Sequence, residues 1–485
     1  MLLKSFGNIL WIPIFIAGIL FFPIARLHYG NANFADLGFF VDSISSVANG
    51  DYRLAFYGHV QIFMFPIAFI AKYTNILYLP YILVGTQSLV IALTLIVLYF
   101  KVNKNAGIIF ALYFPTWYIA LFDFHFDVLV LLLSAIIFSL VKERNFKSAL
   151  LFILFLCFVK EPYCLVAFFF CIYAFIENLK EFNRKNLYLI VVVGIISIII
   201  FFLYTDWLIP HFSNNDIRFQ IGASSFSKYG QSILEVIKNL TLHPFDFIVS
   251  IFLDALKLKY IAVLFSAVLF LPFLAPKYLL PALPILVISM LSIDPSHYSI
   301  RNHYTAGVEI PIVVGAAYGL DYLKNKFNWL LLRKTWFVVN LFFSLNILFT
   351  PSPLGTRFYS AKLWDFYYDR YYKNSNYVGV AQYVKAVVSN SHVDKIYIQN
   401  NIFTLFENVQ VKYIDESIEE CAIKNCIIII DWGRPLFWAD KGCEYTYGRC
   451  QDSAVEEILK NYMKNILMMY KPTYLKENFV VYQRS

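Results

Sequence analysis

The sequence predicts an α-helical polytopic membrane protein, with about eleven transmembrane helices and a small C-terminal extracytoplasmic α/β domain. Hydrophobic residues make up 59% of the 485 residues, and only 15% are charged. Soluble domains are closer to a quarter charged, and the mean hydropathy here is +0.61. Long apolar runs recur until about residue 350 and then stop. A soluble fold is therefore excluded for most of the chain.

The apolar runs are close to bilayer length and are separated by short polar loops. They lie at roughly residues 9–27, 76–100, 106–121, 127–141, 148–160, 163–177, 187–204, 260–274, 278–293, 305–322 and 335–350. Several are shorter than the roughly 20 residues that a perpendicular helix needs, so we expect helical hairpins with polar tips below the membrane surface. The first run ends at Arg26 without a small-residue cleavage site, which indicates an uncleaved helix rather than a signal peptide.

The positions of Lys and Arg predict the orientation of the chain. Residues 59–73 are also apolar, and we expect them to lie along the outer surface, because the basic loops then fall on the same side as Lys4. These loops contain Lys101, Lys104, Lys142, Arg144, Lys147, Lys180, Arg184, Lys185, Lys324, Lys326, Arg333 and Lys334. The sequence therefore predicts an inner-membrane protein with a cytoplasmic N-terminus. Although the net charge is +8, the basic residues form no continuous stripe, which argues against a nucleic-acid partner.

The composition divides the chain into two domains, a transmembrane domain over 1–350 and an extracytoplasmic domain over 351–485. In the second, 395–398 and 426–431 have the pattern of short buried strands, and 378–389 and 453–469 have helical spacing. Two external loops, 28–75 and 205–258, interrupt the first domain. The second loop is expected to form amphipathic surface helices at 233–240 and 245–258.

Cysteine positions fit this organisation. Cys157, Cys164 and Cys171 recur every seven residues near or within spans and are interpreted as small packing residues. Four others, Cys421, Cys426, Cys443 and Cys450, fall in the predicted external domain, where two local disulfides could form. Metal binding by these four is the lesser alternative, because no CxxC pair occurs.

Asp36, directly after the first apolar run, is a candidate general base. A carboxylate at this position is partly desolvated by the bilayer and still reaches an aqueous acceptor. Alternatively, Asp36 caps a helix that starts at Leu37.

Asp123, His125 and Asp127 alternate within a run of phenylalanines. On an extended hairpin tip the three side chains would face the same way, where they could hold a divalent cation or orient one another. The alternative is a hydrated turn in which Asp127 is the N-cap of the next helix.

Two further loops carry charged or hydrogen-bonding groups. Lys160 and Glu161 form either a self-satisfied ion pair or a site in which the lysine meets a lipid phosphate. Arg301 and His303 could bind a phosphate, or they could be interfacial anchors with Tyr304 in an aromatic belt. The chain has no GxSxG, Walker, HExxH or GxGxxG context, which argues against an ATP-driven pump and a membrane metalloprotease.

At these residues the chain resembles a family of predicted prokaryotic multi-pass membrane proteins of unknown function, related by fold to the GT-C glycosyltransferases. The matching motifs are Asp36-Leu37-Gly38, His59, Phe122-Asp123-Phe124-His125, Lys160-Glu161 and His303-Tyr304, within about residues 30–320. Two positions depart from the family pattern. Asp127 stands where a glutamate is common, and Val41-Asp42 stands where an Asp-Gln pair is common.

The resemblance implies an inverting glycosyltransferase of the GT-C type that uses a polyprenyl-phosphate-linked sugar. In this plan Asp36 deprotonates the acceptor, which could be a glycan, a lipid or a protein, and Asp123, His125 and Asp127 position the donor or a metal. The substrate-binding residues would be His59, Asp127, Lys160, Glu161, Arg301, His303 and Tyr304. No cofactor beyond a divalent cation is expected.

Two other functions are alternatives to the transferase: a lipid or polysaccharide transporter or flippase, and a non-catalytic envelope assembly protein. A transporter would show inverted repeats and charges at mid-membrane depth, and the sequence shows neither.

Overall fold

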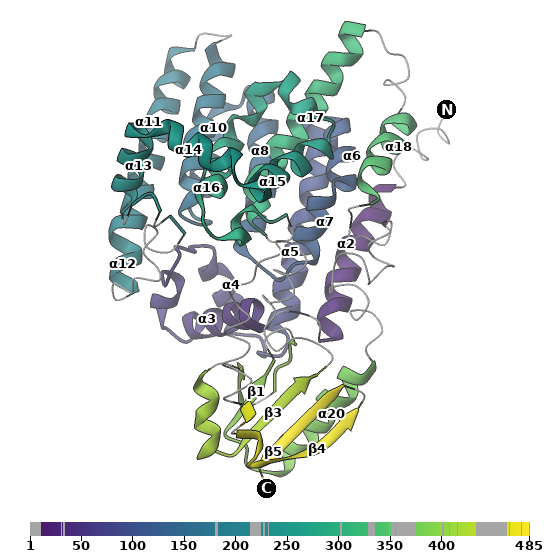
Figure 1. Ribbon diagram of the computed structural model, residues 1–485. Helices are drawn as coiled ribbons and strands as arrows, with labels where there is room; N and C mark the ends of the chain where they lie inside the picture. Colours follow the sequence, from purple (N-terminus) through teal and green to yellow (C-terminus); the bar gives the residue numbers. More distant parts are fainter. Residues whose placement is uncertain are drawn as a thin grey trace.

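The protein is a helical bundle with a small sheet domain at one end, as the computed structural model shows (Figure 1). The structure describes residues 11–179 without 31 and 33; 183–213; 225–300 without 227 and 231; and 303–327. It also describes 335–348, 350 and 355; 375–432 without 400, 401, 407 and 415; and 463–484 without 465 and 477.

Five helical segments of the described chain are long and apolar enough to cross a membrane. They contain α2 (Trp11–His28), α5 (Leu79–Val97), α10 (Pro162–Leu179), α11 (Arg184–Phe202) and α17 (Ala306–Phe327). The protein is therefore a membrane protein. The number of eleven spans stays a prediction, because the remaining apolar runs form shorter helices.

The shorter helices include two hairpins of the kind that the sequence predicts. Helices α6 (Lys104–Leu112) and α7 (Phe114–Leu121) are separated by an extended residue, and α7 turns through 122–128 into α8 (Leu129–Lys142). Helix α9 (Phe146–Leu156) turns through 157–161 into α10. At 1.5 Å per residue, the eight residues of α7 cover only about 12 Å. Helix α7 alone is therefore too short to cross a bilayer. Three further short helices are α15 (Ala255–Ser266), α16 (Leu283–Leu291) and α18 (Thr335–Asn346).

Polar contacts gather several helix ends at the end of the bundle remote from the sheet domain (Figure 1). Lys142 Nζ, at the end of α8, donates to the Val102 carbonyl at 2.6 Å. Glu177, near the end of α10, accepts from Lys277 Nζ at 2.5 Å. Lys277 belongs to a 3₁₀ segment over Pro276–Ala282. Basic loops predicted to share one side of the membrane therefore meet in space.

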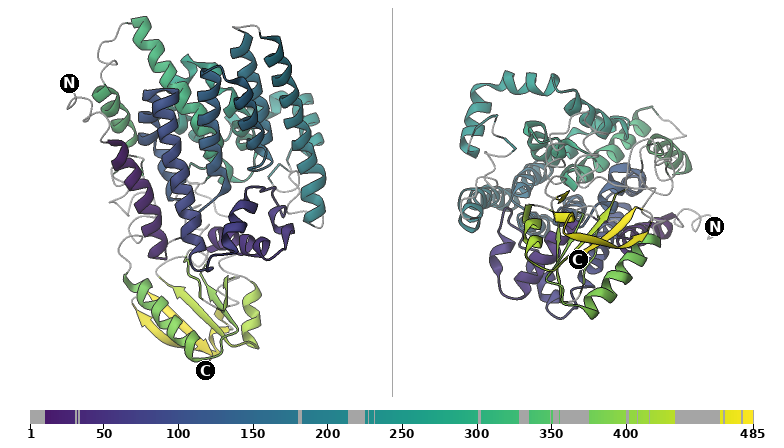
Figure 2. Two further views of the ribbon diagram at one scale, coloured as in Figure 1. Left: turned by 180° about the vertical axis from the view of Figure 1, so that it is seen from behind. Right: turned by 60° about the horizontal axis from the view of Figure 1, so that its bottom comes forward.

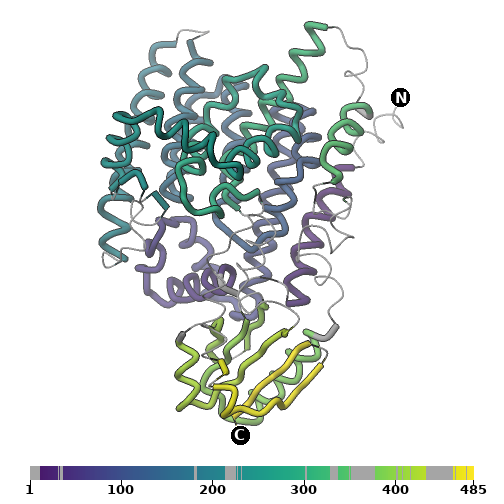
Figure 3. Tube along the Cα trace, in the orientation of Figure 1, coloured from purple at the N-terminus to yellow at the C-terminus, as the bar shows by residue number. Residues whose placement is uncertain are grey.

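The first loop folds at the opposite end, between the bundle and the sheet domain (Figures 1 and 3). It contains a π-helical turn over Phe34–Gly38, α3 (Phe39–Ala48), a 3₁₀ turn over Tyr52–Ala55, and α4 (Met64–Ala71). Helix α4 has eight residues and is too short to cross a bilayer, in line with the surface segment predicted at 59–73.

The second loop contains both expected helices, but the one predicted at 245–258 ends at Phe252, because Asp254 caps α15, which starts at Ala255. Helix α12 (Ile209–Phe212) is followed by α13 (Ile233–Leu242) and α14 (Pro244–Phe252). Exposed apolar side chains, among them Phe245, Phe252 and Leu253, make this segment suitable for contact with lipid.

The C-terminal domain is α/β, as predicted. Helix α20 (Ser375–Asn390) precedes a five-stranded sheet of order β2-β1-β3-β5-β4. Strand β1 (Lys395–Ile398) pairs in parallel with β2 (Gln410–Tyr413) and β3 (Cys426–Asp431), while β5 (Phe479–Arg484) is antiparallel to β3 and to β4 (Tyr470–Lys476). The predicted strands and the predicted helix at 378–389 are confirmed. Most of the helix predicted at 453–469 lies outside the described residues.

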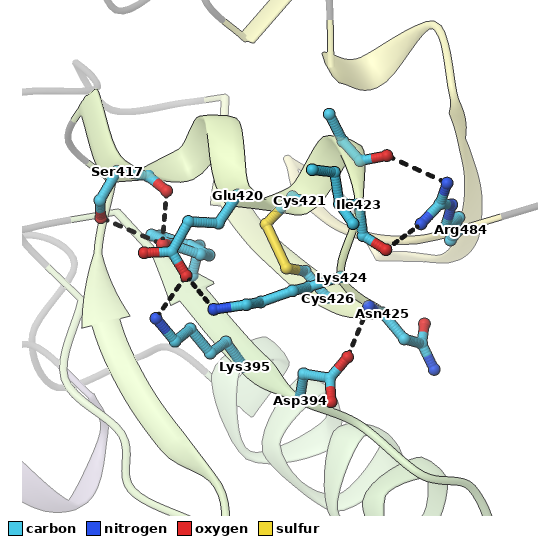
Figure 4. Close-up of a disulfide and its surroundings, with 12 residues drawn as sticks. Asp394, Lys395, Ser417, Glu420, Cys421, Ile423, Lys424, Asn425, Cys426 and Arg484 are labelled. Atoms are coloured by element: carbon cyan, nitrogen blue, oxygen red, sulfur yellow. Dashed lines mark hydrogen bonds and ion pairs between the residues drawn. A yellow bond between two sulfur atoms is a disulfide. The ribbon is translucent and has the colours of Figure 1, made fainter.

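A disulfide joins Cys421 and Cys426 in this domain (Figure 4). Glu420, next to it, accepts from Lys395 Nζ at 2.6 Å and from Lys424 Nζ at 2.5 Å. Arg484 donates to two carbonyls of the loop that the disulfide closes, which attaches the last strand to it. One of the predicted local disulfides is therefore present. Cys443 and Cys450 lie outside the described residues.

The sheet domain packs directly against the first loop (Figure 2). The Phe403 amide donates to the Gly30 carbonyl at 3.0 Å, and the Tyr377 hydroxyl donates to the Phe403 carbonyl at 2.5 Å. Gly30 has a φ of +70°, and a Cβ there would lie 2.4 Å from the Tyr377 ring, so only glycine fits. Strand β2 packs on the π-helical turn Phe34–Gly38. The turn that carries Asp36 is thus held between the two domains.

Candidate functional site

Four segments far apart in sequence bring titratable side chains together at the end of the bundle that faces the sheet domain. They are the first loop, the α7–α8 tip at 122–128, the α9–α10 tip at 157–161, and the 3₁₀ turn His303–Thr305 before α17. Side-chain contacts described below join all four. The segments that carry Asp36, Asp123, Lys160 and His303 therefore share one end of the bundle.

Asp36 is half-buried within the π-helical turn Phe34–Gly38. The N-cap of α3 is Gly38, without a side-chain capping bond, so the alternative that Asp36 caps the following helix is wrong. Burial and the nearby Asp123 carboxylate raise the pKa of Asp36 to about 7, although Arg26 acts in the opposite direction. A carboxyl group that titrates near neutral pH has the protonation behaviour of a general base.

Arg26, in the last turn of α2, forms a buried ion pair with Asp123. The Nη2 to Oδ1 distance is 3.0 Å, and both side chains are at most 5% exposed. Sequence reasoning treated Arg26 only as the end of the first span. A long cationic side chain in the last turn of an apolar helix was the available signal, since such a group needs a partner when it is buried.

Gln87, in the middle of α5, fixes the backbone of the α7–α8 tip. Its Nε2 donates to the carbonyls of Ile119 at 3.1 Å and Phe122 at 2.9 Å, and its Oε1 accepts from the His125 amide at 3.3 Å. Sequence reasoning missed this residue too. An amide inside an otherwise apolar run was the signal, because a buried amide needs several hydrogen bonds.

The His125 ring stacks on the His303 ring, with centroids 3.6 Å apart. Burial lowers the pKa of His125 to about 4, so the imidazole is neutral at physiological pH. Its Nδ1 lies 3.1 Å from the Asp123 carbonyl oxygen, which suits a tautomer that carries the proton on Nδ1.

Asp127 is held by two neighbours from other segments. The Tyr163 hydroxyl donates to its Oδ1 at 2.5 Å, and His303 Nε2 lies 4.0 Å from its Oδ2. The N-cap residue of α8 is Val128, so the alternative of Asp127 as an N-cap is wrong. Tyr163 was not anticipated, and a tyrosine in an aromatic-rich helix carries no distinguishing sequence signal.

The three polar residues of the tip do not form a common ligand set. Asp123 turns to Arg26, whereas His125 and Asp127 contact His303. In the part of the chain that the structure describes, no group of three His, Cys, Asp or Glu side chains is arranged to hold a metal ion. Each of the three side chains is instead oriented by residues of other segments, namely Arg26, His303 and Tyr163.

Lys160 and Glu161 have separate direct partners. Glu161 Oε1 lies 2.8 Å from His59 Nδ1, and its Oε2 accepts from the Val60 amide at 3.4 Å. The Lys160 ammonium lies over the Tyr304 ring, 5.9 Å from its centroid. Among the described residues these two side chains form no ion pair with each other, so the self-satisfied pair is not the arrangement present. Glu161 instead attaches the first loop to the α9–α10 tip.

Of the predicted residues Arg301, His303 and Tyr304, the structure describes the last two. The Tyr304 ring lies beside the His303 ring, with centroids 4.1 Å apart, so both belong to the cluster around Lys160. Arg301 lies outside the described residues. The ammonium of Lys160 is buried, and its electrostatic neighbours are the carboxylates of Asp127 and Glu161 and the phenol of Tyr304.

Comparison with known proteins agrees with the membrane assignment. No curated protein matches the chain. The model of a family described as predicted membrane protein (DUF2079) matches residues 35–393, a range that contains Asp36, both hairpin tips and the turn before α17. Because the match covers well over half of the chain, the protein belongs to the DUF2079 family of predicted membrane proteins.

Proposed function

We propose that the protein is a GT-C-type glycosyltransferase that moves a sugar from a polyprenyl-phosphate donor to an acceptor on the extracytoplasmic face of the membrane. The observation that carries the proposal is Asp36, a half-buried carboxyl group with a pKa raised to about 7, in a turn held between two domains. The Lys160 cluster lies at the same end of the bundle. A base near neutral pH and a buried cation are the two groups that this transfer requires.

In the proposed reaction, an acceptor hydroxyl attacks the anomeric carbon of the donor sugar. The bond between that carbon and the phosphate oxygen breaks, its electron pair leaves with the lipid phosphate, and the hydroxyl proton passes to Asp36. Attack from the face opposite the leaving group inverts the anomeric configuration. Burial keeps the proton affinity of Asp36 high, and the negative charge of Asp123, which Arg26 fixes, adds to it.

The lipid phosphate is a good leaving group, so electrostatic stabilisation matters more than protonation of the leaving oxygen. Lys160 would contact the phosphate, and Arg301 and His303 are proposed to share this role. Asp127 would orient His303, and His125 would support the His303 ring by stacking. Because His125 is neutral, it would act as a hydrogen-bonding group rather than as a cation.

The order of elements supports the GT-C relation that we propose. A first long helix is followed by a loop with an aspartate, a short surface helix, and then hairpins of short helices. The sheet domain covers the aspartate-bearing turn, where an acceptor would approach.

The proposal predicts the topology of the chain. The helix ends that carry Lys142 and Lys324 should be cytoplasmic, and Ser232 and the sheet domain should be outside. The Cys421–Cys426 disulfide supports an outside position, since disulfides persist in oxidising compartments. Single cysteines introduced at Lys142 and Lys324 should resist a membrane-impermeant thiol reagent, and one at Ser232 should react. Labelling of the Lys142 site in intact cells would contradict the topology and place the site on the other face.

The function is tested by mass spectrometry of glycans and lipid-linked sugars in a strain that lacks the protein. We expect one glycosylated product to disappear and its lipid-linked sugar donor to accumulate. The wild-type gene should restore the product, and an Asp36→Asn gene should not. An unchanged set of glycans and lipid-linked sugars would rule out the transferase.

A transporter is the second candidate, because one acidic residue does lie within the membrane domain. Glu309 is fully buried in α17 and lies inside the span predicted at 305–322. The sequence interpretation did not single out this residue. In the same experiment, a transporter would leave the sugar-linked product formed but on the wrong side of the membrane.

A further inference from the structure

Glu309 lies in α17, six residues after His303. Six residues correspond to about 9 Å along a helix, so Glu309 is well inside the bundle. The side chain is completely buried, and the helix around it is one of the most enclosed in the described part of the protein. Acidic side chains at such positions are costly and usually serve a purpose.

The hydroxyl of Thr116 shows which group carries a proton here. Thr116 Oγ1 lies 2.8 Å from the Phe110 carbonyl oxygen and within hydrogen-bonding distance of Glu309 Oε1. A carbonyl can only accept, and a hydroxyl has one hydrogen to donate. If Thr116 donates to Phe110, the contact with Glu309 requires the carboxyl group to be the donor. Glu309 is then protonated.

The break between α6 and α7 creates this arrangement. Tyr113 is extended, and the Phe114 amide donates to Asn346 Oδ1 instead of to the Phe110 carbonyl. The freed Phe110 carbonyl is therefore available to accept from the Thr116 hydroxyl. Broken helices within a membrane domain are tolerated where other groups satisfy the backbone, and here they direct the Thr116 oxygen to Glu309.

The electrostatic surroundings also favour the neutral acid. Among the described residues, no Lys, Arg or His lies within ion-pair distance of Glu309. By contrast Glu177, another buried glutamate, has Lys277 at 2.5 Å and Arg144 at 3.5 Å. A carboxylate buried without a cation is much less stable than the neutral acid.

Two more polar atoms lie in the 3₁₀ turn His303–Thr305, which joins the candidate site to α17. Thr305 Oγ1 and His303 Nδ1 are buried, and neither has a hydrogen-bond partner in the described structure, nor does Glu309 Oε2. Thr305 and Glu309 are four residues apart, a spacing that places side chains on one face of a helix. Buried polar atoms of this kind are usually satisfied by water molecules, which can carry protons.

We infer that Glu309 is a proton-binding site inside the membrane domain, which is protonated at neutral pH and exchanges its proton through Thr305 with the cluster at His303. This inference does not rest on the proposed transferase activity. A transferase would use the site as a store for the proton released by the acceptor, and a transporter would use it for coupling to a proton gradient.

Infrared spectroscopy of the purified full-length protein at pH 8 tests the protonation. We expect a carbonyl-stretching band of a protonated carboxyl group that is lost in Glu309→Gln and kept in Glu177→Gln, the matched control. The glutamine side chain of Glu309→Gln retains a hydrogen-bond donor toward Thr116, so the fold should be preserved, which the thermal unfolding temperature checks. Absence of the band in wild type, or its persistence in Glu309→Gln, would overturn the inference.

Hydrogen–deuterium exchange of the same band tests the path. Transfer into D₂O should shift the band in wild type, and Thr305→Val should slow the shift at least tenfold. Thr94→Val is the control, because Thr94 is a buried threonine whose hydroxyl donates within its own helix, to the Val90 carbonyl. Equal exchange rates in wild type and Thr305→Val would exclude Thr305 from the path.

Discussion

Replacing Asp36 with asparagine should lower sugar transfer by about two to four orders of magnitude, the usual contribution of a positioned general base. Asparagine keeps the size of the side chain but cannot accept the acceptor's proton. The measurement is the turnover rate of purified protein with a polyprenyl-phosphate sugar at saturating concentrations. Transfer within a few-fold of wild type would remove Asp36 from the mechanism.

The pH dependence of wild-type transfer follows from the same residue. Because the pKa of Asp36 is raised to about 7, the base is mostly deprotonated above pH 7 and increasingly protonated below it. The rate should therefore rise with pH and level off above about 7, with close to a tenfold loss per pH unit on the acidic side.

Two controls separate chemistry from folding. Asp51 lies in the same loop but is paired with Arg53 at the exposed surface, so Asp51→Asn should transfer sugar at the wild-type rate. The pKa of Asp36 is higher in the folded protein than in the unfolded chain, so folding favours the protonated carboxyl group. The free energy of unfolding therefore falls as the pH rises from the pKa of Asp36 in the unfolded chain to its folded value of about 7. Asp36→Asn removes this loss and should be at least as stable as wild type at pH 8.

Residue patterns were sufficient to predict the broad fold because the bilayer imposes simple rules. Apolar runs must be helical, and a change of composition near residue 351 marks a domain that is not in lipid. The strands at 395–398 and 426–431 were predictable from apolar residues between polar ones. The break at Tyr113 was missed, although Pro115 was an available signal, since a proline inside a helical pattern ends or kinks the helix just before it.

The acidic residues of the candidate site could be predicted from the sequence, but the residues that pair with them could not. Asp36, Asp123 and Asp127 stand out because a charged group in an apolar run is conspicuous. Which cation faces which acid depends on contacts between segments nearly a hundred residues apart, such as Arg26 with Asp123. Local spacing therefore wrongly suggested that the three polar side chains of the tip share one direction.

Replacing Arg26 with leucine should destabilise the protein by about 3–5 kcal/mol, the cost of leaving one partner of a buried ion pair without its counter-ion. Arg26 and Asp123 are both buried, so water cannot replace the lost guanidinium. The measurement is equilibrium unfolding in detergent micelles, with increasing denaturant. Arg53→Leu is the matched control, since it breaks a solvent-exposed pair with Asp51 and should change stability little.

A second substitution shows whether the lost charge is the cause. In Arg26→Leu with Asp123→Leu, both charges are gone and the two apolar side chains can pack against each other, so most of the stability should return. If the double variant is as unstable as the sum of the two single variants, Arg26 stabilises the protein through packing of its long side chain rather than by neutralising Asp123. Arg26→Lys distinguishes charge from hydrogen-bond geometry, because lysine keeps the positive charge but lacks the planar guanidinium group. If Arg26→Lys is more stable than Arg26→Leu, charge contributes more than hydrogen-bond geometry to holding Asp123 beside Asp36.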